Sequence, residues 1–396
     1  MDKKPEKLVP EVRFKGFTDD WEQRKLGEIS KRVRNNDGRM NLPLLTISAR
    51  YGWMTQQSRF SASIAGREKK NYTLLKKHQL SYNHGNSKVA NYGTVYELTD
   101  YDEALVPKVY HSFSLTSENS SKFIESYFHT KKLDAQLRKF IASTARMDGL
   151  LNISFDDFMK VKLFAPERCE QSKISRIINL IEKLITLQQR KMEQLKQLKK
   201  AMLQQLFVNK NNKQPILKFK NFRNNWREYK LSEIVSLEDN KRKPVKATER
   251  IRGKIPYYGA NGIQDYVKGY THIGKHVLIA EDGANSVDDY PIYFIYSPSW
   301  INNHTHVLTA KEEILSSEFL AYALKKINYA KYLVGSGRYK LNAEILKLIP
   351  LKIPTMNEQK YIESNLSKID KLIALQQNKL TQLTALKKYL LQKLFI

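Results

Sequence analysis

A phosphate-binding loop is the first chemistry that the residue spacing suggests. The stretch GYTHIGKH, from Gly269 to His276, has the G-x-x-x-x-G-K spacing of a nucleotide-binding loop. His276 stands where a Ser or Thr would hold magnesium, and Lys275 leads into the strand-like run VLIA rather than into a helix. We therefore assign no nucleotide site to this stretch.

Metal-dependent catalysis is the second chemistry to weigh. His304 and His306 lie in NNHTHV, where a strand would point both side chains to one face, but the sequence identifies no further ligand. Glu281 and Asp282 suggest a metal-dependent nuclease, yet no E-x-K partner follows them at nuclease-like spacing. A G-x-G-x-x-G cofactor loop and an N-P-P-Y run are absent as well. The sequence thus predicts no catalytic residue, no metal site and no cofactor site.

Recognition of nucleic acid is the chemistry that the remaining polar residues favour. Asn and Gln pair with adenine, Arg pairs with guanine, and Lys contacts phosphate. Turns also favour Asn and Ser, and basic residues can simply form a solvated surface, so both alternatives stay open for each position. The candidate DNA-binding residues are His84, Asn86, Ser87, Lys88, Asn91, Tyr92, Arg146, Lys241, Arg242, Lys243, Asn261, Gln264, Asn285, Ser286, Asn303, His304, Arg338 and Lys340.

The composition favours a polyanionic partner. The 396 residues carry 68 Lys and Arg against 40 Asp and Glu, which gives a formal net charge of +28. With 41% hydrophobic residues the chain has enough apolar material to fold. The single cysteine, Cys169, excludes an internal disulfide and a Cys-rich zinc module. No apolar run resembles a signal peptide or a membrane span, so we expect a soluble cytoplasmic protein.

The sequence contains an internal duplication. FKGFTDDWEQRKLGEI, beginning at Phe14, matches FKNFRNNWREYKLSEI, beginning at Phe219. A longer second block ends at Val208 in the first copy and at Ile396 in the second, and each copy follows a strand-like run, KVKLFAPE or LIPLKIPT. The stretches between the repeated blocks look unlike each other. Two matched blocks in the same order around dissimilar inserts indicate duplication, with the inserts free to set specificity.

Each copy of the second block is predicted to form one long helix of about 38 residues, roughly 57 Å long. Apolar residues alternate by three and four, as in a coiled-coil seam, and the seam is interrupted at Gln188 and at its counterpart Gln376. The leucines assigned to the seam include Leu184, Leu198, Leu372 and Leu386. An ordinary surface helix is the alternative. We expect the two helices to pair antiparallel within the chain and to act as a ruler that spaces the two variable regions.

These features together resemble the specificity (S) subunit of type I restriction-modification systems. The resemblance covers essentially the whole chain. It rests on the paired W-x-x-x-x-L-x-E-I motifs at Trp21 and Trp226, on IPYYGANGIQDYV (255–267), LIAEDGAN (278–285) and NNHTHVL (302–308), and on the P-x-x-x-EQ transitions at Pro166 and Pro354.

The resemblance implies an α+β fold with two globular target-recognition domains joined by two long antiparallel coiled-coil helices. The expected segments are target-recognition domain 1 (14–150), a central repeated helical region (151–212), target-recognition domain 2 (213–340) and a distal repeated helical region (341–396). Each recognition domain would read one half of a bipartite, asymmetric DNA site.

The resemblance also implies partners. Two methyltransferase (M) subunits would dock on the helices and restriction/translocase (R) subunits would join them. S-adenosylmethionine, ATP and Mg²⁺ would bind to those partners and not to this chain. Two alternatives remain on the sequence alone, a free-standing nuclease and a nucleic-acid-coating coiled-coil protein without sequence preference.

Overall fold

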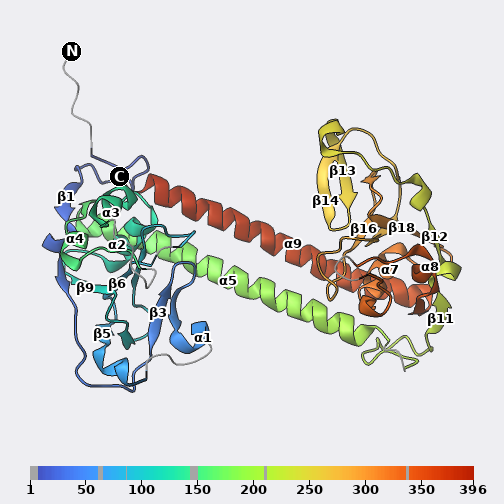
Figure 1. Cartoon of the computed structure of the whole chain (residues 1–396), viewed down its shortest axis with the longest axis horizontal. Coiled ribbons are helices and arrows are strands. Elements are labelled where there is room, and N and C mark those ends of the chain that lie inside the picture. The colour runs from blue at the N-terminus through green and yellow to red at the C-terminus, as the bar shows by residue number, and fades with distance from the viewer. Residues whose placement is uncertain (1–7, 61–65, 86, 143–149, 209–211, 336–338) are drawn as a thin grey trace, which may run out of the picture. The chain divides into compact units, whose positions relative to one another are not determined.

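The structure, a computed structural model, describes residues 8–60, 66–85, 87–142, 150–208, 212–335 and 339–396. Contacts divide the chain into two compact units, residues 1–189 with 378–396 and residues 190–377 (Figure 1). Each unit contains one variable region and parts of both long helices. The four predicted segments follow the repeat rather than these contacts, and their boundaries stay a prediction. In the described part of the chain, no helix has the length and hydrophobicity of a membrane span.

The two variable regions share one sheet topology. The first unit has a four-stranded sheet with the order β2–β9–β6–β7, and the second has a four-stranded sheet with the order β12–β18–β15–β16. All neighbours are antiparallel in both sheets. The two regions are therefore structurally alike, which their sequences do not indicate. The strands are β2 (Ser30–Arg32), β6 (Leu80–Asn83), β7 (Thr94–Glu97), β9 (His111–Leu115), β12 (Val235–Leu237), β15 (His276–Ala280), β16 (Ile292–Ile295) and β18 (Thr305–Ala310).

Each unit also carries a β-hairpin, β3 (Leu45–Ser48) with β4 (Gly52–Thr55) in the first and β13 (Arg252–Gly259) with β14 (Gly262–Val267) in the second. The second strand of each hairpin begins at a glycine with positive φ, 73° at Gly52 and 102° at Gly262. A Cβ on these glycines would lie 3.2 Å from the Tyr96 ring and 3.3 Å from the Tyr293 ring, respectively. The two hairpins are thus held against the sheets in the same way.

Short strands from the repeated blocks complete each unit. The strand after each repeated Trp pairs antiparallel with the strand that precedes a long helix, β1 with β10 and β11 with β19. This confirms the strands predicted in KVKLFAPE and LIPLKIPT. The remaining elements are β1 (Glu22–Lys25), β10 (Lys162–Ala165), β11 (Arg227–Lys230), β19 (Pro350–Ile353), β5 (Thr73–Lys76), β8 (Glu103–Val106), β17 (Trp300–Ile301), α1 (Gln56–Phe60), α2 (Ser121–His129), α3 (Asp134–Phe140), α4 (Phe155–Phe158), α6 (Leu231–Ile234), α7 (Ser317–Leu324) and α8 (Ala343–Leu348).

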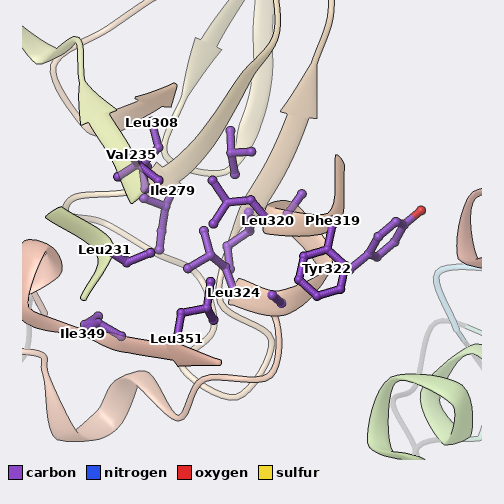
Figure 2. Close-up of a cluster of buried hydrophobic side chains, with 14 of the residues drawn as sticks. Leu231, Val235, Ile279, Leu308, Phe319, Leu320, Tyr322, Leu324, Ile349 and Leu351 are labelled. Carbon is purple, nitrogen blue, oxygen red and sulfur yellow. The ribbon is translucent and has the colours of Figure 1, made fainter. Parts of the chain in front are cut away.

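The core of the second unit lies between its sheet and helix α7. Ile279 and Leu308 from the sheet and Phe319, Leu320 and Leu324 from α7 point toward one another (Figure 2). All five are fully buried, which agrees with their place in the apolar runs VLIA, THVL and FLAYAL. The burial of these side chains is what fixes the sheet on the helix.

The two long helices are α5 (Arg168–Leu206) and α9 (Met356–Lys393), which confirms the predicted lengths. In the first unit the early part of α5 lies beside the late part of α9, where Glu182 binds Lys387 at 2.8 Å. In the second unit the late part of α5 lies beside the early part of α9, where Lys199 binds Asp370 at 2.5 Å. Glu182 corresponds to Asp370 in the repeat, and Lys199 corresponds to Lys387. Such reciprocal pairing is the pattern of two like helices that run antiparallel.

The heptad prediction is wrong in one respect. Leu184, Leu198, Leu372 and Leu386, which it assigns to the seam, are 37%, 49%, 45% and 44% exposed. Polar pairs such as Glu182 with Lys387 take part of the contact between the helices, so these leucines face outward.

The start of each long helix is fixed by a buried glutamine from the repeat. The Gln171 side chain accepts the backbone N–H of Ser120 at 2.9 Å and donates to the Pro166 carbonyl at 2.9 Å. Its counterpart Gln359 accepts the N–H of Ser316 at 2.9 Å and donates to the Pro354 carbonyl at 3.0 Å. Ser120 and Ser316 are the N-caps of α2 and α7, so each glutamine joins the long helix to the recognition region.

We predict that Gln359→Ala lowers the free energy of unfolding by about 2 kcal/mol or more, because it leaves buried backbone groups without hydrogen-bond partners. Urea unfolding of the full chain measures the effect. The control, Gln194→Ala, removes an exposed glutamine of α5 and should change stability by less than about 0.5 kcal/mol. Equal urea midpoints for the two variants would contradict the role of Gln359.

Candidate nucleic-acid interface

In each unit, hydrogen bonds join the hairpin to the end of a central sheet strand or to the loop that follows it. This strand is β6 in the first unit and β15 in the second. In the second unit the Asn261 amide donates to the Gly283 carbonyl at 2.9 Å and accepts the N–H of Asn285 at 2.9 Å. In the first unit the Asn83 amide donates to the Ile47 carbonyl at 3.0 Å. Hairpin and loop therefore form one continuous surface in each unit. The predicted DNA-binding residues Asn261 and Asn285 lie together there, and the amide of Asn261 is already used to join the two segments.

A network of charges supports the same loop in the second unit. The Glu281 carboxylate accepts from the Arg242 guanidinium at 2.7 Å and lies 3.0 Å from the Lys340 ammonium. The His306 ring lies 2.5 Å from the Asp239 carboxylate and 2.7 Å from the Leu341 carbonyl. Arg242 and Lys340, which the sequence predicts to contact phosphate, thus both form ion pairs with Glu281 that stabilise the fold.

The charges of this network shift the pKa values of its carboxyl groups. Burial alone would raise the pKa of Asp239, but the hydrogen bonds from His306 and the Val307 N–H, together with the charges of His306 and Arg242, outweigh burial and lower that pKa below its usual value. For Glu281, burial also acts to raise the pKa, and the hydrogen bonds from Arg242 and Lys340 together with the charges of His306 and Arg242 outweigh it, so this pKa is lowered too. Both groups therefore stay ionised at neutral pH.

The acidic and histidine residues that raised the question of catalysis have partners within the chain. Ligand atoms of Asp239, Glu281 and His306 lie within 4.8 Å of one another, a spacing that a metal ion would accept. Arg242 and Lys340 neutralise this cluster, so its geometry is that of an ion-pair network.

The expectation that His304 and His306 share a strand face is wrong. His304 lies in the turn before β18 and binds Asp282 at 2.5 Å, whereas His306 is buried inside β18. The strand begins only at Thr305, because Asn302 accepts the N–H of His304 and closes a tight turn.

Histidines of the first unit are also structural. His84 is buried, and its two ring nitrogens lie 2.7 Å and 2.8 Å from the carbonyls of Leu151 and Val109. His111 stacks on His84 and binds the Ile153 carbonyl at 3.0 Å. Burial lowers the pKa of His111 to about 4. His111 and His306 bind the same backbone position in the two units, just before α4 and α8, so each holds the return of the chain to the repeated block.

The other predicted residues divide by exposure. Exposed side chains without a hydrogen bond or ion pair to the described residues are Lys88, Asn91, Lys243, Gln264 and Asn303. Lys241 is exposed and pairs with Glu238, and Tyr92 is half-buried. The Ser87 and Ser286 hydroxyls accept backbone N–H groups within their own turns. Asn86, Arg146 and Arg338 lie outside the described residues. Base contact by any of these residues stays a prediction.

Two exposed residues in the turn of the first hairpin, Arg50 and Tyr51, are not among the predicted DNA-binding residues. The signal that could have found them is the similar layout of LPLLTISARYG and IPYYGANG, an apolar residue and Pro followed by a short run that ends in Gly. That layout marks equivalent hairpins in the two units.

Residues 223–385 match the family described as type I restriction modification DNA specificity domain. A putative type I restriction enzyme specificity subunit of Haemophilus influenzae is 47% identical over 129 residues, which cover 33% of this chain and 33% of that protein. A Methanocaldococcus jannaschii type I specificity subunit is 23% identical over 297 residues, covering 67% of this chain and 68% of that one. In fold, the chain is similar to a crystal structure of the type I S subunit from M. genitalium, with a TM-score of 0.70, 16% identity and coverage of 98% of this chain and 99% of that one.

The lowered pKa values of Asp239 and Glu281 give a pH prediction. Both carboxyl groups are more acidic folded than unfolded, so their stabilisation is complete at neutral pH and is lost as the pH falls below about 4. We expect Glu281→Gln to lower the free energy of unfolding at pH 7 by about 1 kcal/mol, because Arg242 and Lys340 lose their ion pairs with Glu281 and, of the described carboxylates, Arg242 keeps only Asp239, at 3.3 Å. The difference from the parent chain should shrink as the pH falls below 4, and urea titrations at several pH values measure it. A difference that stays constant with pH would contradict the assignment.

Proposed function

We propose that this chain, a member of the type I restriction-modification specificity subunits, selects the DNA site for a larger complex and contributes no catalytic residue itself. The observation that carries the proposal is the repetition of one sheet-and-hairpin architecture in two units whose exposed loops differ. Each unit reads one half of a bipartite, asymmetric site in double-stranded DNA. The net charge of +28 supplies the attraction to the phosphates.

Exposed leucines on the long helices support docking of two copies of one partner. Leu184, Leu187 and Leu198 on α5 correspond in the repeat to Leu372, Leu375 and Leu386 on α9, and all six are between 37% and 57% exposed. Exposed apolar residues at matched positions give the chain two similar docking surfaces. We assign these surfaces to two methyltransferase subunits, with restriction/translocase subunits joining the complex.

The chemistry of the complex then belongs to these partners. S-adenosylmethionine would bind to the methyltransferase subunits, and ATP and Mg²⁺ to the restriction subunits. The present chain places each methyltransferase over an adenine that has to be turned out of the base stack. We infer that the complex works in the cytoplasm, as expected for the specificity subunits that this chain resembles.

Co-expression of the chain with the methyltransferase subunit encoded beside it, in a host without other DNA methylation, tests this function. We expect sequencing of modified adenines to yield a single split motif, methylated on both strands. A catalytically inactive methyltransferase subunit is the control and should give no modified adenine. A stable complex that methylates no defined motif would contradict the proposed function.

A ruler function of the helices predicts that spacer length follows helix length. Inserting one seven-residue repeat after Gln188 and another after Gln376 lengthens each helix by about 10 Å, the length of about three base pairs. We expect the methylated motif to keep both half-sites and to gain about three unspecified bases between them. Changed bases within a half-site, or an unchanged spacer in an active complex, would contradict the ruler.

A further inference from the structure

The turn of the first hairpin, residues 49–51, is exposed, and its backbone is hydrogen-bonded on both sides. The Ser48 hydroxyl accepts the backbone N–H groups of Arg50 and Tyr51, each at 3.3 Å. The Ala49 carbonyl accepts the Tyr96 hydroxyl at 3.3 Å, so the turn is also bonded to strand β7. Gly52 adopts a positive φ and packs on the same Tyr96 ring. The backbone of this turn is therefore restrained by hydrogen bonds from within its own unit.

The side chains of the turn are not used by the fold. Tyr51 is 68% exposed, a large apolar surface to leave in water. The Arg50 guanidinium lies 5.4 Å from the Tyr51 ring centre and has no hydrogen-bond or ion-pair partner among the described residues. Arg59, by contrast, lies nearby in sequence and donates to the Ile47 carbonyl at 2.6 Å. Arg50 is thus an exposed cation on a hydrogen-bonded turn, beside an aromatic ring that a guanidinium can stack on.

This arrangement matches the chemistry of the DNA major groove. The groove admits a two-stranded β-ribbon, and an arginine that reaches its floor binds guanine O6 and N7 with two hydrogen bonds. The equivalent turn in the second unit contains Ala260 and Asn261, and the side chain of Asn261 is bonded to the adjacent loop. The two turns therefore present different groups on similar supports, as two readers of an asymmetric site require.

We propose that the turn at residues 49–51 enters the major groove of one half-site and that Arg50 reads a guanine there. This inference rests on the proposed function and deepens it, because it names the element and the base. Tyr51 positions the guanidinium and covers the adjoining base pair.

The test compares methylation and binding by the complex that carries the parent chain or its variants Arg50→Ala, Arg50→Lys and Arg138→Ala. Arg138 is an exposed arginine on α3 of the same unit and serves as the matched control. For Arg50→Ala we expect one guanine position in one half-site to become degenerate, with the other half-site unchanged. Affinity for the parent site should fall on the order of 10- to 100-fold, the usual worth of a bidentate base contact. Arg138→Ala should leave motif and affinity unchanged.

Arg50→Lys separates base reading from a simple phosphate contact. Lysine keeps the charge but loses the planar pair of donors, so discrimination at the guanine position should stay poor. If Lys restores the parent motif and affinity, or if Arg50→Ala weakens binding equally to all sequences, Arg50 contacts phosphate and the inference is overturned. An unchanged motif for Arg50→Ala overturns it as well. The parent complex tests the proposed function separately. If the parent complex gives no split motif, the proposed function and the inference about Arg50 are both overturned, whereas the results for the Arg50 variants bear on the inference alone.

Discussion

The rest of the structure depends on one constraint: each long helix begins in one unit and ends in the other, where a phenylalanine just after the helix completes the aromatic core. In the first unit Phe395, just after α9, packs on Trp21 with ring centres 6.4 Å apart. In the second unit Phe207, just after α5, packs on Trp226 at 6.0 Å. The first unit therefore completes its core only with a distant second stretch of the chain, residues 378–396, whereas the second unit is one continuous stretch, residues 190–377. The repeated blocks are conserved between the two copies because both cores need the same tryptophan, the same phenylalanine and the same helix in between.

The repeat tolerates different solutions around this shared frame. In the second unit the indole N–H of Trp226 donates to Glu358 at 3.2 Å. In the first unit the equivalent Glu170 is held by Arg13 at 2.8 Å, and the indole nitrogen of Trp21 has no partner among the described residues. The variable regions likewise adapt to the helices, since Lys122 of α2 binds Glu182 beside the pair that Glu182 makes with Lys387.

The sequence was sufficient to predict what depends on local periodicity and on the repeat. The two long helices and the strands before them followed from spacing and from the repeat, because a pattern of three and four residues has one simple structural meaning. The common topology of the variable regions was not predictable, since it depends on pairings between distant segments with different side chains. For the same reason the sequence could not separate Asn261, whose amide joins two loops, from Gln264, which is exposed nearby. Only the partners supplied by the fold distinguish a structural asparagine from one that is free to meet a ligand.

The packing of Phe395 on Trp21 also sets the order in which the chain can fold during synthesis. The site beside Trp21 and Phe123 is made early, but its missing aromatic ring leaves the ribosome only after the whole second unit. At a usual rate of 5–20 residues per second, that interval lasts tens of seconds. The second unit meets no such delay, because Phe207 precedes Trp226 in the chain. The nascent first unit therefore holds an open hydrophobic site during most of translation, and it becomes a finished domain after the unit encoded behind it.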